Sequence, residues 1–289
     1  MLIPLKEDEV KEYINKVYKL GLDLSKSSYP TYKDKIKTKD DFIKKTYSSF
    51  NKMNGEVLLF KDNKSSKVEG YIKYYFIKED KYISVDIFNI SKHYSFALDE
   101  FINYVTLKYK GYDLYLGYSI KNKDAINYLS SNENGFSLLD TLEHNIIKLN
   151  KYKIVKESPY VNIVDSNNFN DFKELHDKSI SSNTYWNSTR IKEDLSNWLI
   201  FNRYDFNNNI VASIYVRNVN LMYEVFGIDY VNNEFNNTSF RELMGSVLNF
   251  IKKIGVEHLV YFGNRNEQSI LDRLGFKHFD TYQSFYKTL

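Results

Sequence analysis

The chain has 289 residues, of which 43% are hydrophobic and 27% charged, a composition typical of a globular protein with one large domain or two of ordinary size. Its 40 basic and 37 acidic side chains leave a net charge of +3, which gives no electrostatic reason to expect a nucleic-acid partner. The lack of cysteine excludes disulfides, thiolate nucleophiles and cysteine metal sites, and it fits a reducing compartment.

The amino-terminal segment, residues 1–13, turns acidic early and so lacks the apolar core of a signal peptide. The apolar runs that follow are shorter than the ~18 residues of a membrane-spanning helix. We therefore expect a cytoplasmic protein with no membrane partner.

The first half begins with two polar segments of helical character and continues with three segments rich in aromatic and β-branched residues, which favour strands. These five segments are residues 6–21, 39–50, 55–60, 68–77 and 81–90. Residues 94–109 then have the apolar spacing of an amphipathic helix. Its face consists of Tyr94, Ala97, Leu98, Phe101, Ile102, Val105 and Tyr109. A strand and a helix within 113–129 precede a Gly-Phe pair at 135.

The second half repeats this order. Its two helical segments and three strand segments are residues 169–180, 188–198, 198–206, 209–218 and 220–231. The amphipathic helix at 236–253 has an apolar face of Phe240, Leu243, Met244, Val247, Leu248, Ile251 and Ile254. A matching strand, helix and Gly-Phe pair at 275 follow. We therefore predict two domains, 1–150 and 151–289, joined in the segment 149–162, where Pro159 and a run of charges interrupt the pattern.

Each half resembles the Gcn5-related N-acetyltransferase (GNAT) fold, and the whole chain resembles a tandem GNAT protein. The resemblance is carried by GIDYV at 227–231, the helix at 236–253 and NRNEQSILDRLGF at 264–276. It implies an α/β protein of two tandem GNAT-like domains, each with a mixed sheet. In that family the sheet opens between its fourth and fifth strands, and the pyrophosphate of acetyl-CoA meets the start of the next helix.

The start of the helix at 236–253 is the candidate pyrophosphate site. A helix amino terminus offers unpaired N–H groups and a positive dipole end to an anion. The family motif of Arg or Gln, then Gly, then Gly or Ala, falls here on Glu234, Asn237 and Ser239, which is a degraded match. A second interpretation is purely structural, because Ser239 and Glu242 have the spacing of a capping box.

The resemblance implies further cofactor contacts in the second half, from main-chain groups of the third strand, from the helix start and from two asparagines. The predicted cofactor-binding residues are Val225, Phe226, Gly227, Ile228, Asp229, Asn237, Thr238, Ser239, Phe240, Asn264 and Asn266. A role in turns is the alternative for the asparagines. In the first half, the bulky His93 and Tyr94 stand at the equivalent turn, so we expect no phosphate site there.

Glu224 is the candidate catalytic base. Met222, Phe226, Ile228 and Tyr230 share its parity in the strand, so apolar neighbours on one face would raise its pKa. The resemblance also implies a water-coupled glutamate base in this strand. The alternative is a strand glutamate paired with a nearby Lys or Arg.

The family's usual acid is a tyrosine whose position here is Leu271, and Tyr128, Tyr282 and Tyr286 are weak replacements. The histidines show no metal-binding spacing, so we expect no metal. Trp186 and Trp198 favour core packing over an acceptor pocket.

These observations predict an acetyl-CoA-dependent N-acetyltransferase, active in its second half, that acts on a small amine or a peptide amine. The alternatives are a non-catalytic GNAT-like protein that binds acyl-CoA or a partner, and an aminoacyltransferase that uses charged tRNA, which the low net charge disfavours. The sequence leaves the acceptor and the oligomeric state open.

Overall fold

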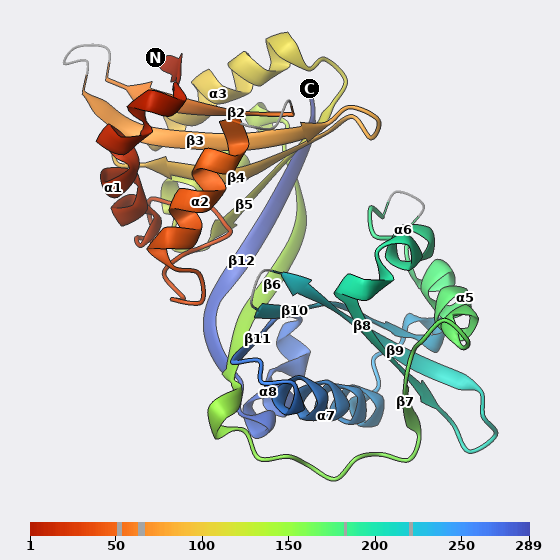
Figure 1. Cartoon of the computed structure of the whole chain (residues 1–289). Coiled ribbons are helices and arrows are strands. Elements are labelled where there is room, and N and C mark those ends of the chain that lie inside the picture. Colours follow the sequence, from red (N-terminus) through yellow and green to blue (C-terminus); the bar gives the residue numbers. More distant parts are fainter. Residues whose placement is uncertain (51–53, 63–66, 182–183, 220–221) are drawn as a thin grey trace. The chain divides into compact units, whose positions relative to one another are not determined.

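The computed structural model describes residues 1–50, 54–62, 67–181, 184–219 and 222–289. Contacts divide the chain into two compact units. The first consists of Met1–Leu142 and Asp280–Leu289, and the second of Glu143–Phe279. Each unit is a mixed sheet with helices on both faces, as predicted for the α/β class (Figure 1). None of the described helices is both long and apolar enough to cross a membrane.

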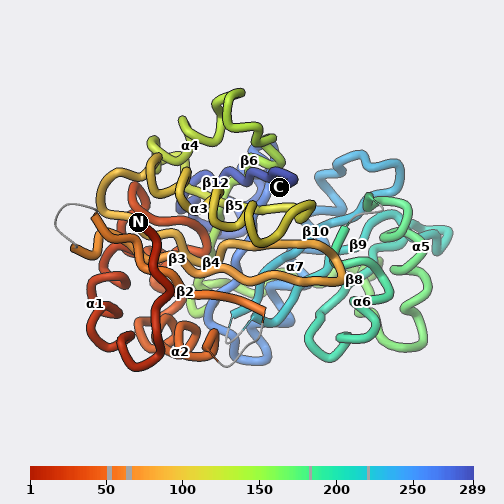
Figure 2. Tube along the Cα trace, turned by 90° about the horizontal axis from the view of Figure 1, so that it is seen from above, coloured from red at the N-terminus to blue at the C-terminus, as the bar shows by residue number. Residues whose placement is uncertain are grey.

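In the first unit the strands lie in the order β1-β2-β3-β4-β5-β12. Their bounds are β1 Leu2–Pro4, β2 Gly55–Lys61, β3 Val68–Ile77, β4 Tyr82–Ile90, β5 Asp113–Ser119 and β12 Lys277–Thr288. One face is covered by α1 (Val10–Gly21) and α2 (Lys39–Phe50), and the other by α3 (Tyr94–Lys108) and α4 (Lys123–Leu129). Figure 2 shows the two helix pairs on opposite sides of these strands.

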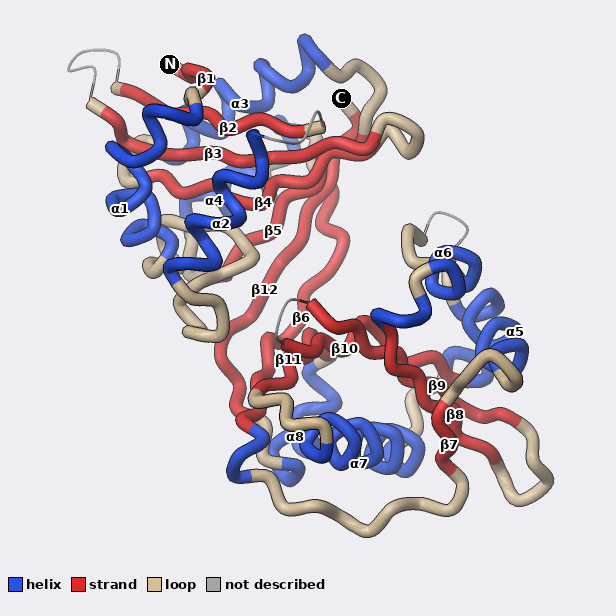
Figure 3. The backbone as a smooth tube through the Cα atoms, in the orientation of Figure 1, coloured by secondary structure: helices blue, strands red, loops and turns tan. Residues whose placement is uncertain are grey.

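In the second unit the order is β6-β11-β10-β9-β8-β7. The strand bounds are β6 Ser137–Lys148, β7 Val161–Ile163, β8 Trp198–Tyr204, β9 Ile210–Val219, β10 Met222–Tyr230 and β11 His258–Gly263. Helices α5 (Phe169–Ser179) and α6 (Ser188–Glu193) pack on one face, and α7 (Asn237–Lys253) and α8 (Gln268–Leu274) on the other (Figure 3). Short 3-10 turns join these elements at Glu7–Glu9, Asn132–Asn134, Leu149–Lys151, Leu195–Asn197, Val231–Asn233 and Arg265–Glu267.

The two amphipathic helices bury the predicted faces. The apolar positions from Tyr94 to Val105 are buried on α3, and those from Phe240 to Ile251 on α7. The last predicted position of each face lies just beyond its helix, which ends at Lys108 or Lys253. Tyr109 is partly buried there, and Ile254 is 51% exposed. The predicted order of helices and strands is present in both halves, and the short strands β1 and β7 were not predicted.

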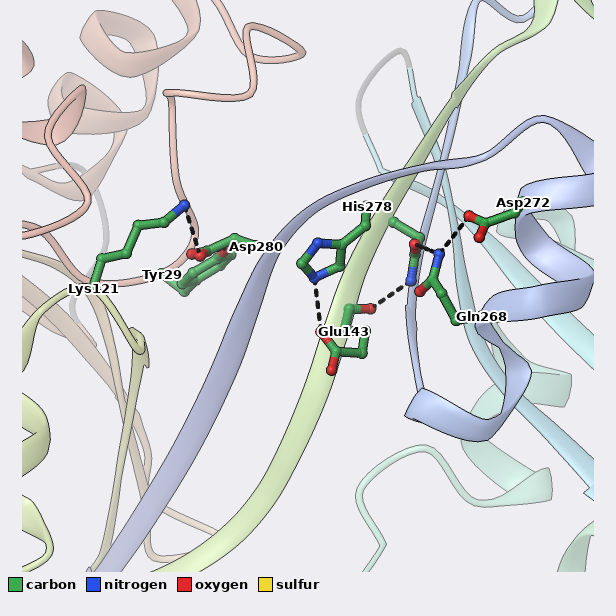
Figure 4. Close-up of polar contacts among 8 residues, drawn as sticks. Tyr29, Lys121, Glu143, Gln268, Asp272, His278 and Asp280 are labelled. Atoms are coloured by element: carbon green, nitrogen blue, oxygen red, sulfur yellow. Dashed lines mark hydrogen bonds and ion pairs between the residues drawn. The ribbon is translucent and has the colours of Figure 1, made fainter.

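The last strand of each half belongs to the sheet of the other unit. The end of β12 pairs antiparallel with β5, and β6 pairs antiparallel with β11. In the first unit, Asp280 of β12 accepts from the Tyr29 hydroxyl at 3.1 Å and pairs with Lys121 at 3.1 Å (Figure 4). The two halves of the sequence therefore exchange their last strands. A repeat boundary near residue 150 stays a prediction about the duplication of the sequence.

Each sheet opens at the same place. The parallel pairing of β10 with β11 runs only from Tyr223 to Val225, although β10 continues to Tyr230. In the first unit, β4 pairs with β5 only from Tyr82 to Ser84 and continues to Ile90. A β-bulge interrupts each long strand just after this point. The duplication is therefore visible in the irregularities of the sheets as well as in their order.

Candidate functional site

Helix α7 begins two residues before Ser239. The side chain of Asn236 accepts from the Ser239 N–H at 2.9 Å, so Asn236 is the N-cap. The predicted capping box of Ser239 and Glu242 is therefore wrong, and Glu242 instead accepts from Arg203 at 2.8 Å. Polar residues are consecutive here, and the exit of the chain from β10 decides which of them caps the helix.

The first turn of α7 retains free donors. Asn237 and Thr238 are exposed, and within the described chain no protein group accepts from their main-chain N–H groups. Ser239 and Phe240 are buried beneath them. The helix start thus offers two outward amides to an anion, from two of the four helix residues predicted to bind the cofactor.

The predicted main-chain contacts lie along the open edge of β10. Beyond Val225 the strand pairs with β9 but no longer with β11, so the stretch Phe226–Tyr230 faces the opening on its other side. Phe226, Gly227 and Ile228 are partly exposed, whereas Asp229 is buried. Main-chain groups at such an edge are available to a ligand, because no neighbouring strand takes them.

The bulge at Phe226 changes the expected faces of β10. Val225 pairs with Val216, but Gly227 pairs with Tyr215, so one residue is inserted. Ile228 and Tyr230 consequently pack on the α7 side, while Phe226 packs on the α5 side with Trp198. The prediction that all of these share a face with Glu224 is wrong, because an inserted residue reverses the alternation of a strand.

Glu224 lies on the α5 side beside an arginine. In the register it stands opposite Arg217, and Arg217 stands opposite Trp198 on β8. The guanidinium of Arg217 stacks on Trp186 and pairs with Asp194 at 2.9 Å. This cross-strand row of Glu224, Arg217 and Trp198, with Trp186 stacked on Arg217, therefore combines a partly buried carboxylate, a cation and indole rings.

An aromatic cluster packs in the core on the α7 side of β10. Phe235 lies between Tyr230 and Phe240, with ring centroids at 5.8 and 5.7 Å, and the exposed Glu234 lies outside this packing. Tyr261 bonds Glu267 at 2.8 Å. Among the described groups, the buried Tyr230 hydroxyl has no partner, and the burial of Tyr230 raises the pKa of that hydroxyl. An unpaired polar atom at this edge is a place where a ligand group can bond.

Comparison with solved structures decides the fold. The GCN5-related N-acetyltransferase from Sphaerobacter thermophilus aligns over 99% of this chain and 95% of its own, at 9% identity and a TM-score of 0.66. A tandem GNAT protein from the clavulanic acid biosynthesis pathway aligns over 99% and 98%, at 10% identity and a TM-score of 0.59. The chain has the tandem GNAT fold.

A third GNAT structure is the GCN5-related glucosamine N-acetyltransferase region of a fungal multi-domain GH3 β-N-acetylglucosaminidase. It aligns over 99% of this chain and 38% of that protein, at 10% identity and a TM-score of 0.65. No protein-family model and no curated protein sequence matches the chain.

The residue predicted to stand at the acid position carries no hydroxyl. Leu271 on α8 is fully buried in the core. Tyr128 bonds Asp99, while Tyr282 packs edge-on against Tyr29 in the first unit. Tyr286 stacks on Tyr115, also in the first unit.

The two asparagines after β11 are both exposed. Asn264 forms a capping box with the buried Glu267, whose side chain accepts from the Asn264 N–H at 2.8 Å. Asn266 lies in the 3-10 turn that follows. The structural role proposed for Asn264 is therefore present, and cofactor contacts from both residues stay predictions.

An unexpected cavity lies in the first unit beside the turn that precedes α3, the counterpart of the turn that precedes α7. Tyr94 is buried and its hydroxyl donates to the Phe88 carbonyl at 2.7 Å, while His93 is exposed with a left-handed φ of 58°. A cavity of about 300 Å³ lies at this turn. Its lining is Ser25, Lys26, Ile90, Ser91, Lys92, Tyr94, Lys121, Lys123 and Asp124.

Four lysines from three separate segments line this cavity. Lys121 pairs with Asp280 and Lys26 lies 3.9 Å from Asp23, while Lys92 and Lys123 have no ion-pair partner among the described residues. Sequence reasoning missed these lysines because they are far apart in a chain where lysine is common. Their only signal is the pair of lysines on either side of Asn122.

Proposed function

We propose that the chain is an acetyl-CoA-dependent N-acetyltransferase that acts on a small amine or a peptide amine. The observation that carries this proposal is the opening in the second unit. There the pairing of β10 with β11 ends at Val225, and the free edge of β10 leads to the uncapped amides of Asn237 and Thr238. The main chain of such an edge can hydrogen-bond the extended, amide-containing arm of acetyl-CoA, and the amides of the helix start can bind its diphosphate.

Each part of the site has a separate role in the proposed reaction. Acetyl-CoA, when bound, supplies the thioester that is attacked by the amine. Main-chain groups of Val225–Asp229 hold the arm and polarise the thioester carbonyl, and Glu224 takes the proton from the attacking nitrogen, directly or through water. With Leu271 at the usual acid position, solvent protonates the leaving thiolate.

The first unit provides a second candidate for the phosphate groups. A nucleotide with a diphosphate and a further phosphate carries several negative charges, and the start of α7 offers it amides but has Glu234 beside it. The cavity in the first unit offers four lysines and the start of α3, where the Tyr94–Phe96 amides have no acceptor among the described residues. Coulomb attraction favours the lysine cavity.

Thermal unfolding with acetyl-CoA tests binding and assigns the half. At a free concentration of 100 times Kd, one site adds about 2.7 kcal/mol to the free energy of unfolding. Thr238→Glu places a carboxylate at the start of α7, and Lys26→Glu with Lys123→Glu reverses two charges in the cavity. Loss of the shift in one variant alone identifies the unit that binds. No shift in the wild-type protein would refute both cofactor sites.

Release of free thiol with a panel of amines then tests catalysis. We expect Glu224→Gln to lower kcat by about 10²–10⁴-fold with little effect on the binding of acetyl-CoA. Glu257→Gln is the matched control, because it makes the same change at an exposed carboxylate that has no part in the proposed site. Equal activity of Glu224→Gln and wild type would exclude Glu224 as the base. Binding without turnover would favour the non-catalytic alternative.

A further inference from the structure

A fully buried histidine in the second unit contacts two acceptors. Nδ1 of His176 on α5 lies 2.8 Å from Oδ2 of Asp229 on β10, and Nε2 lies 2.9 Å from the main-chain oxygen of Trp186. His176 is 0% exposed and Asp229 is 5% exposed. The ring stacks on Phe172 and meets Tyr215 edge-on, each at 4.9 Å. The contact with Asp229 is buried and the contact with Trp186 is partly buried.

These contacts determine how many protons the pair holds. A carbonyl oxygen only accepts, so Nε2 must carry a proton to bond Trp186. If Asp229 is ionised, Nδ1 must carry a second proton, and if Nδ1 is bare, Asp229 must be protonated. In both cases the pair holds one proton more than a neutral histidine beside a carboxylate.

The surroundings of His176 favour this extra proton. Burial alone would lower the pKa of His176, but the hydrogen bond and charge of Asp229 outweigh it and raise the pKa. Burial raises the pKa of Asp229 as well, so the pair keeps its one extra proton to higher pH.

The other charged groups near His176 affect its pKa less than Asp229 does. On α5, Asp177 adds a weaker attraction and is itself paired with Lys173. On β9 the facing group is Tyr215, whose burial keeps it neutral. On α6, Arg190 lies over the ring of Tyr185 and Lys192 lies over Phe169. The turn Val231–Asn233, which also packs on α5, carries no ionisable side chain.

Trp186, which is bonded by His176, contacts the row that contains Glu224. The ring of Trp186 lies 5.2 Å from that of Trp198 and 6.5 Å from that of Phe226, the bulged residue of β10. It also carries the guanidinium of Arg217 at 4.2 Å. A change in the position of Trp186 therefore reaches the arginine opposite Glu224.

We infer that His176 is a positioning residue, in which one retained proton ties the Trp186 carbonyl to Asp229 and so fixes Trp186 on strand β10. Loss of that proton leaves one ring nitrogen facing an acceptor without a hydrogen, and one of the two contacts breaks. The inference concerns the free protein and does not depend on acetyl-CoA or on catalysis.

Nitrogen NMR of the histidine rings tests the proton count directly. At pH 8 we expect His176 either to be protonated on both nitrogens or to have a bare Nδ1 beside a protonated Asp229 carboxyl. Carbon shifts of labelled aspartate distinguish the two cases, and both support the tie. A singly protonated His176 beside an ionised Asp229 would overturn it.

Tryptophan fluorescence tests whether a contact of His176 breaks when the proton is lost. The chain has only 2 tryptophans, Trp186 and Trp198, and both pack in the core on the α5 side. We expect the emission to change with pH as in the titration of a single proton, on the alkaline side of pH 6.5. In Asp229→Asn the amide N–H donates to a neutral Nδ1, so both contacts persist without the extra proton and the change disappears. His258→Gln, a control on β11, keeps it. An emission constant until global unfolding, or a change that persists in Asp229→Asn, would contradict the inference.

Discussion

Tyr215 on β9 lies over Gly227 on β10 so closely that a Cβ at Gly227 would stand 2.1 Å from the hydroxyl oxygen of Tyr215. The two residues are partners in the register just after the bulge, and only a residue without a side chain leaves room for the ring. Gly227 is thus required by packing, whether or not its main chain also contacts a cofactor.

Gly227→Ala should displace the ring of Tyr215 and lower the free energy of unfolding by about 1–3 kcal/mol, the usual cost of overpacking a core. Urea denaturation measures the change. In a Tyr215→Val background the same substitution should cost much less, because the ring is gone. Additive effects of the two changes would show that the contact is not the cause.

Asn236→Ala should lower stability by about 1 kcal/mol, because it removes the acceptor for the Ser239 N–H at the start of α7. Asn237→Ala is the matched control, since Asn237 is the adjacent exposed asparagine and does not cap the helix. Thermal unfolding of both variants checks this. An equal loss in the two would argue against the cap.

Asp86 in the first unit, the bulged residue of β4, is bonded by the buried Lys73 at 2.6 Å and lies 3.3 Å from Lys45. Asp86→Asn should cost about 3–5 kcal/mol, because it leaves the charge of Lys73 buried without its counter-charge. Lys45→Gln removes a far more exposed partner and should cost under about 1 kcal/mol. Chemical denaturation distinguishes the two, and similar costs would contradict the assignment.

The same pair predicts a dependence on acid. Burial acts to raise the pKa of Asp86, but Lys45 and Lys73 outweigh it and hold the pKa below its ordinary value. A lowered pKa contributes stability above the unfolded value of about 3.9 and loses it as the pH falls through the folded value. We expect wild type and Asp86→Asn to converge in stability in strong acid, as measured by denaturation at several pH values.

His176 predicts the opposite sign. Its pKa is raised in the folded state, so its contribution is complete below about pH 6.5 and declines as the pH rises through the folded value. The stability of wild type relative to Asp229→Asn should therefore fall with alkaline pH. A difference that stays constant from pH 6 to pH 9 would show that the pair does not retain the proton.

Periodicity made the helices predictable. The spacing from Phe240 to Ile251 identifies α7 and its buried face, because a helix face repeats every three or four residues regardless of what it packs against. The order of elements in each half was predictable for the same reason. The cap was not, because Asn236, Asn237 and Ser239 are all suitable, and the path of the chain from β10 selects one.

The faces of β10 could not be predicted, because its bulge arises from pairing with β9 and leaves no mark on the alternation of the sequence. The pairing of His176 with Asp229, and the lysines around the first-unit cavity, bring together residues distant in the chain. The exchange of β6 and β12 between the two halves of the sequence likewise depends on which strands pair in the folded chain.

The sequence by itself determined the elements and their duplicated order, because these depend on local spacing and composition, and its motifs resemble those of a tandem acetyltransferase. Only the tertiary structure decided where each sheet opens, which face Glu224 shares, which asparagine caps α7 and which buried groups hold a proton. These depend on hydrogen bonds and charges between segments that meet only when the chain is folded.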